Sequence, residues 1–296
     1  MQVKLAFSAP PAMSPRLRLA VTAVLFSTGG AAIKWCQFGA WQLAGVRAGV
    51  ACTTLLLLLP ETRRGWTWRT VLVGAAYAAT TLLYVLSNKL TTAANTIFLQ
   101  NTAPIFILAL APWLLHEHVR RQDIGYMAAL GIGMALFFAG TPRAFATAPN
   151  PRLGNLLAAT CAVTWALTLI GYRWLVRGAE PGGAPVARAA VCGNLMACLL
   201  GLAVAVPLAP GRPADWLVVL YLGTCQLGVA YVFFSRAVPQ VRAIEVSLLL
   251  LLEPVLNPLW AWLVHGETPG PYAVLGGAII LAATAQHAWS ARVATA

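Results

Sequence analysis

The chain has 296 residues and a formal net charge of +12, and only 9% of its residues are charged, whereas 59% are hydrophobic. Soluble domains carry about 25% charged residues, so a soluble protein is excluded, and the continuous runs of Leu, Ala, Val and Gly exclude a transmembrane barrel of short alternating strands. The basic residues stand singly or in pairs between apolar segments, so we expect no nucleic-acid partner. The composition predicts an all-α integral membrane protein.

Ten apolar segments follow one another along the chain, separated by short stretches that contain charged residues, proline or glycine. Each is long enough to cross about 30 Å of hydrocarbon as a helix. The first follows the basic lead "MSPRLR" and has no small-residue cleavage site behind it, so we interpret it as a retained span rather than a signal peptide. The predicted spans are 17–36, 39–60, 68–88, 91–115, 123–141, 153–175, 186–206, 214–237, 242–265 and 271–291.

Lysine and arginine are distributed unequally between the two ends of the predicted spans. With the N-terminus inside the cell, fourteen of the twenty basic residues fall on the cytoplasmic side and five on the outer side, and Arg47 lies within the second span. Because positive charge is enriched in cytoplasmic loops, this orientation is favoured. Both termini are therefore expected to be cytoplasmic.

Two stretches half a chain apart share one pattern. Residues 103–117 read "APIFILALAPWLLHE" and residues 253–267 read "EPVLNPLWAWLVHGE", each with a proline inside an apolar run and a glutamate thirteen residues later. Each half contains five spans, an odd number, so the halves must have opposite orientations. We therefore predict ten transmembrane helices arranged as two inverted five-helix repeats, an arrangement typical of secondary transporters. The expected divisions are a cytoplasmic tail at 1–16, a first repeat at 17–148 and a second at 149–296.

This plan resembles the drug/metabolite transporter superfamily, in its EamA-type branch. The stretch "AIEVSLLLLLEPVLNPLWAWLVHGE" follows the Leu-Glu-Pro-Val pattern and the terminal Gly-Glu of that branch, whereas in the first copy His116 stands where the pattern has glycine. The resemblance covers nearly the whole chain. Within the branch, the chain is most similar to exporters of amino acids, particularly aromatic ones. It implies a multi-pass protein of the bacterial inner membrane.

Two prolines and one acid inside the spans are candidates for gating or coupling. Pro104 and Pro254 each remove a backbone donor, which predicts either a hinge with free carbonyls at mid-depth or a static kink. Glu253 lies near the middle of the ninth span, where it is a candidate proton carrier, ligand for a substrate ammonium, or structural acid paired with a helix end or with Arg47. Since the family pattern contains this glutamate, a structural or gating role is favoured over recognition.

Three further charged residues complete the candidate set. Arg47 lies in "AGVRAGV", which predicts a close helix contact through Gly45 and Gly49 with an internal partner for the guanidinium; binding of a substrate carboxylate is the alternative. Glu117 and Glu267 lie at span ends, where we expect them to accept hydrogen bonds from the first amides of the following helix.

Aromatic and polar side chains within the spans are candidates for lining a cavity that binds a flat or amphipathic solute. Ordinary packing is the alternative for each of them. The candidate substrate-binding residues are Thr28, Tyr77, Tyr84, Asn88, Asn101, Trp165, Gln226, Tyr231, Asn257 and Trp260.

The chain shows no pattern for a cofactor, a metal or an ATPase. None of the three lysines lies in a phosphate-binding loop, the six cysteines form no CxxC pair, and the four histidines lie near span ends. A membrane enzyme is therefore the less favoured alternative. We predict a secondary transporter that exports small amphipathic metabolites, most readily amino acids including aromatic ones, by alternating access; another metabolite or a drug is the alternative cargo. Efflux is either facilitated or coupled to protons, and a monomer in the lipid bilayer suffices.

Overall fold

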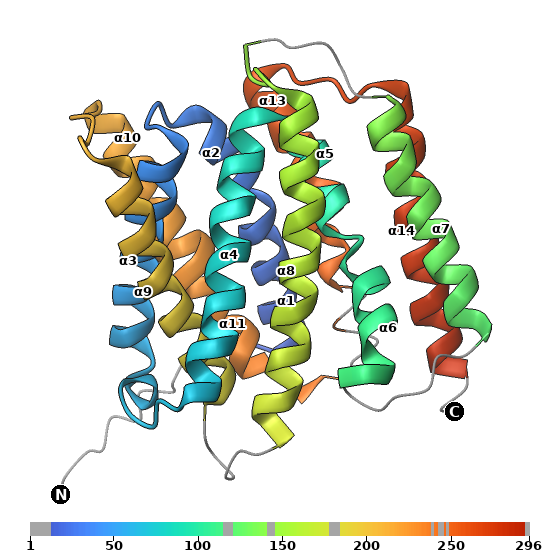
Figure 1. Ribbon diagram of the computed structural model, residues 1–296, viewed down its shortest axis with the longest axis horizontal. Helices are drawn as coiled ribbons and strands as arrows, with labels where there is room; N and C mark the ends of the chain where they lie inside the picture. The colour runs from blue at the N-terminus through green and yellow to red at the C-terminus, as the bar shows by residue number, and fades with distance from the viewer. Residues whose placement is uncertain are drawn as a thin grey trace, which may run out of the picture.

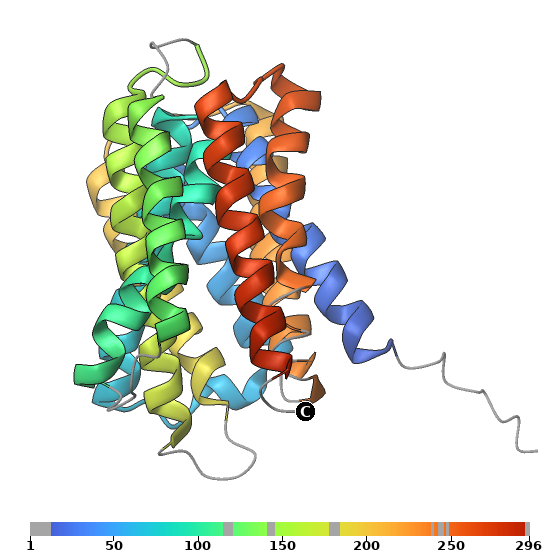
Figure 2. The same ribbon diagram turned by 90° about the vertical axis from the view of Figure 1, so that its right-hand side faces the viewer.

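The protein is a bundle of long helices that stand roughly side by side (Figure 1). In both views α1 begins and α14 ends at the same end of the bundle (Figures 1 and 2). No strand occurs in the part of the chain that the structure describes. The predicted cap Glu117 lies outside that part. The structure, a computed structural model, describes residues 13–114, 121–140, 146–177, 184–237, 240–241, 246 and 249–293.

The predicted ten-helix fold is confirmed, and the helix bounds differ from the predicted limits by a few residues, except in the ninth span, 242–265, where the described helix begins at Leu252. The first half begins at α1 and ends with α7, and α8 begins the second half at the end of the bundle opposite to the start of α1 (Figure 1). The helices are α1 (Pro15–Ser27), α2 (Gly29–Trp35), α3 (Ala40–Leu58), α4 (Trp68–Leu90), α5 (Ala93–Gln100), α6 (Ala103–Leu114), α7 (Arg121–Ala139), α8 (Pro151–Arg177), α9 (Pro185–Ala205), α10 (Pro213–Tyr221), the π-helix η2 (Leu222–Val229), α11 (Ala230–Ala237), α13 (Leu252–His265) and α14 (Pro271–Val293), with a short 3₁₀ turn, η1 (Pro60–Arg63).

Several spans are interrupted near their middle. The sequence predicted such interruptions only at the prolines Pro104 and Pro254. The first span divides at Thr28, which ends α1 before α2 begins. The fourth divides between α5 and α6, and Pro104 is the second residue of α6, where a helix needs no amide donor. In the ninth span Pro254 is likewise the third residue of α13. The eighth span instead continues through a π-helical turn between α10 and α11.

Small residues let α3 and α9 approach until their backbones touch. A Cβ atom added to Gly45 would lie 2.8 Å from the amide nitrogen of Leu202, and one added to Gly201 would lie 2.7 Å from the Cα atom of Gly45. Only glycine allows such a contact, which is the usual way helices associate in lipid. The predicted close packing around Gly45 and Gly49 is therefore observed.

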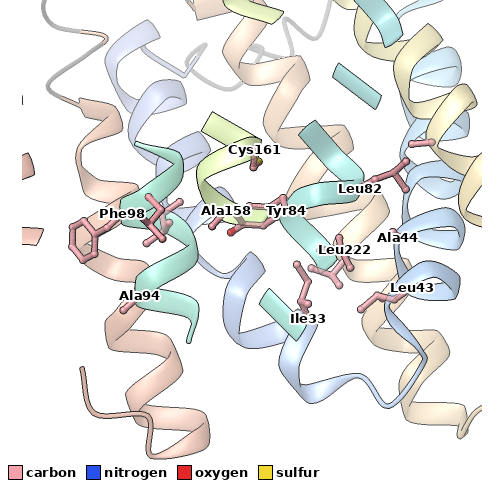
Figure 3. Close-up of a cluster of buried hydrophobic side chains, with 14 of the residues drawn as sticks. Ile33, Leu43, Ala44, Leu82, Tyr84, Ala94, Phe98, Ala158, Cys161 and Leu222 are labelled. Carbon is pink, nitrogen blue, oxygen red and sulfur yellow. The ribbon is translucent and has the colours of Figure 1, made fainter. Parts of the chain in front are cut away.

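The buried core draws on both halves of the chain. Ile33, Leu82 and Phe98 of the first half lie in one cluster with Cys161 and Leu222 of the second (Figure 3). At the edge of the bundle α7 packs along α14 (Figures 1 and 2). These are the last helices of the two halves, so the halves also meet there. The core thus holds the two repeats together around the interrupted spans.

Candidate functional site

A cavity of about 120 Å³ lies where the interrupted spans meet. Its lining comes from α1, α3, α4, α5, α8, η2, α11 and α13, and therefore from both halves of the chain. These residues lie near the middle of their spans, so the cavity lies near the membrane midplane. The lining residues are Phe26, Arg47, Tyr77, Thr80, Thr81, Tyr84, Ile97, Gln100, Asn101, Trp165, Gln226, Leu227, Tyr231 and Glu253.

Arg47 of α3 is the cationic residue of this cavity. Its side chain is buried, with 2% of its surface exposed, and its Nη2 donates a hydrogen bond to Oε1 of Gln226 at 2.8 Å. Its Cζ lies 5.9 Å from the centre of the Tyr84 ring, within the range of a cation–π contact. Nε and Nη1 have no hydrogen-bond acceptor, and no carboxylate lies within ion-pair distance, among the described residues. The charge of Arg47 is therefore only partly compensated by the protein.

Gln226 holds the guanidinium from the π-helix η2. While its Oε1 accepts from Arg47, its Nε2 donates to the backbone oxygen of Phe26 in α1 at 3.3 Å. Single π-helical turns occur within α-helices mainly at functional sites. The sequence "LGTCQLGV" carries no signal for such a turn. The cavity therefore has a fixed polar bridge between three helices.

Glu253 supplies a carboxyl group to the cavity from the first turn of α13. It lines the cavity, keeps an intermediate exposure, and forms no ion pair with Arg47 within 4.0 Å. The amide end of a helix carries partial positive charge, so the start of α13 partly compensates this carboxylate. A structural acid in contact with a helix end agrees with this position, whereas a structural acid paired with Arg47 does not.

The break between α5 and α6 also borders the cavity. Oε1 of Gln100 is buried without a donor among the described residues, and the Asn101 side chain donates to the backbone oxygen of Ile97 at 2.8 Å. The residues before Pro104 and before Pro254 thus place polar groups at one cavity. Discontinuous helices of this kind form the binding sites of many secondary transporters.

Six of the ten candidate substrate-binding residues line the cavity, together with Arg47 and Glu253. Asn88 and Asn257 lie behind the lining, and Asn257 donates to the Tyr84 hydroxyl at 3.3 Å. Thr28 and Trp260 instead border a separate apolar groove, where the Trp260 ring nitrogen donates to Ser27 at 2.9 Å. The residues at the cavity are Tyr77, Tyr84, Asn101, Trp165, Gln226 and Tyr231.

Sequence reasoning missed six lining residues. Thr80 and Thr81 lie three and four positions after Tyr77 and precede Tyr84, so all four share one face of α4. This polar stripe in an apolar helix was a usable signal. No comparable pattern distinguishes the others, which look like ordinary packing residues or an isolated amide. The missed residues are Phe26, Thr80, Thr81, Ile97, Gln100 and Leu227.

Glu267 caps a different helix from the one predicted. Its Oε2 accepts from the backbone amide of Ala93 at 3.1 Å, so it caps the start of α5 and not that of the following helix, α14. Its Oε1 lies 2.9 Å from Nζ of Lys34, and both side chains are almost fully buried. Nζ also donates to the backbone oxygens of Thr91 and Thr147. The prediction was wrong because the helix that the acid caps lies in the other half of the chain.

Comparison with known proteins finds a family and a solved structure that are similar to this chain. The model of the EamA-like transporter family matches residues 17–139 and again residues 152–286. A solved structure titled "Crystal structure of protein" has a TM-score of 0.62 and 22% sequence identity, over 95% of this chain and 99% of that one. At this identity the likeness shows the fold alone. No curated protein sequence matches the chain.

Proposed function

The chain belongs to the EamA-like transporter family, and on that premise we propose that it exports amino acids, including aromatic ones, by alternating access across the bacterial inner membrane. Membership makes it a multi-pass membrane protein that transports small metabolites. The choice of amino acids as cargo, the outward direction and the mechanism are the proposal.

The observation that carries the proposal is the composition of the cavity. A cation (Arg47), an acid (Glu253) and the rings of Tyr77, Trp165 and Tyr231 line one space near the midplane. An aromatic amino acid has the matching parts, which are a carboxylate, an ammonium group and a ring. Pockets use a mainly apolar lining with a few placed polar groups to bind such solutes.

The cavity volume supports a mechanism in which the protein changes shape. Its volume of 120 Å³ is below the roughly 300 Å³ at which ligand pockets begin. An amino acid with a large side chain therefore requires the lining helices to move apart. The junction between α5 and α6 before Pro104 and the start of α13 at Pro254 are the natural places for that motion, because neither proline can donate a hydrogen bond to the preceding turn.

The end of the bundle away from the termini supports the same mechanism. There the buried Lys34–Glu267 ion pair joins α2 of the first half to the segment after α13 of the second. A contact that holds the two halves together at one end is what a closed gate requires. In the inverted conformation the halves exchange roles, and this contact opens.

The test is flux through the purified protein in liposomes. We expect a labelled aromatic amino acid to move down its own gradient without nucleotide, and protein-free liposomes provide the control. The panel includes aliphatic and acidic amino acids, each measured with and without a pH gradient. Absence of flux for every amino acid would refute the proposal. Flux that does not respond to the pH gradient would select facilitated efflux over proton antiport.

A further inference from the structure

We infer that Arg47, held by Gln226, binds the carboxylate of the transported solute. The inference deepens the proposed function and rests on it, because it assigns one end of the amino acid to one residue. It also makes the free carboxylate a requirement for recognition.

The charge of Arg47 calls for an anionic partner. A buried cation in a membrane protein is costly unless it is paired or hydrated, and such residues usually pair with acids or several carbonyls. Arg47 is 2% exposed, yet in the part of the chain that the structure describes it has a single hydrogen-bond partner, the neutral amide of Gln226. A guanidinium has five N–H donors. A carboxylate bound in the cavity would supply the missing charge and acceptors.

The glycines on either side of Arg47, and not Arg47 itself, pack α3 against the neighbouring helix α9. Gly45 and Gly49 contact α9, since a Cβ atom at Gly49 would lie 2.8 Å from Sγ of Cys198, and one at Gly45 would meet Leu202. Arg47 is two positions from each glycine, so it lies on the other side of α3. Helix packing therefore explains the two glycines and leaves the arginine to the cavity.

Gln226 fixes the guanidinium without neutralising it. The amide is anchored to the Phe26 backbone, so it cannot rotate freely, and it occupies only one of the Arg47 nitrogens. A carboxylate can still approach an edge of the planar group with two N–H donors, which is the strongest geometry for this pair. Lysine could not reproduce that arrangement because its ammonium is a point charge.

The test compares L-phenylalanine with phenethylamine, the same molecule without the carboxylate. Binding of each compound to the purified full-length chain is measured by titration calorimetry, and flux of L-phenylalanine is measured separately in liposomes. We expect the wild type to prefer L-phenylalanine by about 10- to 100-fold, the range for a hydrogen bond to a charged group. In Arg47→Gln the preference should fall to near 1, and in Arg47→Lys it should be intermediate.

The variant Gln226→Glu guards against simple loss of folding. It keeps the shape of the side chain and gives Arg47 an internal carboxylate, an ion pair that offsets the lost hydrogen bond to the Phe26 backbone, so the protein should resist heat about as well as the wild type. The preference for L-phenylalanine should nevertheless fall to near 1, because the introduced carboxylate already compensates the charge of Arg47. Arg69→Gln removes the same charge at the exposed start of α4, and it should keep the wild-type preference.

The outcomes separate this inference from the proposed function. If L-phenylalanine is transported and Arg47→Gln keeps the wild-type preference, the inference is wrong and the proposed function stands. If no amino acid is transported but L-phenylalanine binds in an Arg47-dependent way, the carboxylate site stands and amino-acid export is wrong. If the wild type binds phenethylamine as well as L-phenylalanine, the inference is overturned whatever the flux.

Discussion

Replacing Glu267 by alanine tests how strongly the buried pair at the end of α13 holds the two halves together. Nζ of Lys34 lies 2.9 Å from Oε1 of Glu267, and the two side chains are 2% and 4% exposed. At an effective dielectric constant of about 20, two charges at this separation attract by about 6 kcal/mol, part of which offsets their desolvation. Glu267→Ala leaves Lys34 with only the carbonyls of Thr91 and Thr147 and frees the Ala93 amide.

We expect Glu267→Ala to lower the free energy of unfolding by about 3–5 kcal/mol, the usual cost of removing one partner of a buried pair. Glu267→Gln should cost less, because the amide oxygen can still accept from Ala93. Lys34→Met removes the other charge, and in the double variant the two costs should not add. Unfolding by sodium dodecyl sulfate in mixed micelles measures all four proteins. Costs that add within about 0.5 kcal/mol would refute the reasoning, since coupled residues deviate by more than that.

Two further substitutions test the packing and the break in the fourth span. Gly201→Ala should destabilise the protein by about 1–3 kcal/mol, because the new methyl group would meet backbone atoms of Gly45 at 2.7 Å. The control Gly125→Ala should not destabilise it, because no atom lies within 4 Å of the added methyl group. Equal effects of the two substitutions in unfolding titrations would contradict this prediction. Pro104→Ala restores an amide that can bond to Gln100 and join α5 to α6. One such bond favours the straight helix by about 1 kcal/mol, so liposome flux should fall about 2- to 10-fold while stability is kept, and unchanged flux would argue against a hinge there.

The architecture was accessible from the sequence because lipid imposes strict rules. Length and apolarity identify a span, so the described helices begin and end near the predicted limits, except in the ninth span, where α13 begins at Leu252. The break before Pro104 was also foreseeable, because a missing donor is visible in the sequence. The break at Thr28 was not, since it is stabilised by hydrogen bonds of the Thr28 hydroxyl to the Leu25 backbone and to Tyr221, a partner far along the chain.

The candidate site was predictable only in part, because the sequence shows the chemistry of each side chain and not its neighbours in space. Residues with both a ring and a polar group, such as Tyr77 and Trp165, stand out in an apolar span, and they line the cavity. Phe26 has no such feature, and its contribution depends on where α1 ends. The partners of Arg47 and Glu267 could not be predicted from the sequence, because contacts between distant segments depend on how the helices are arranged in space.

The π-helix η2 makes the number of residues in the eighth span a determinant of the site. Each bond in such a turn reaches one residue further than in an α-helix, so η2 can be regarded as an α-helix that has accepted an inserted residue. Removing one residue before Gln226 would restore the regular helix and rotate that side chain by about 100°. Among related chains, the length of this segment therefore bears on the cavity as much as the identity of its residues, and an alignment that hides the insertion would compare the wrong positions.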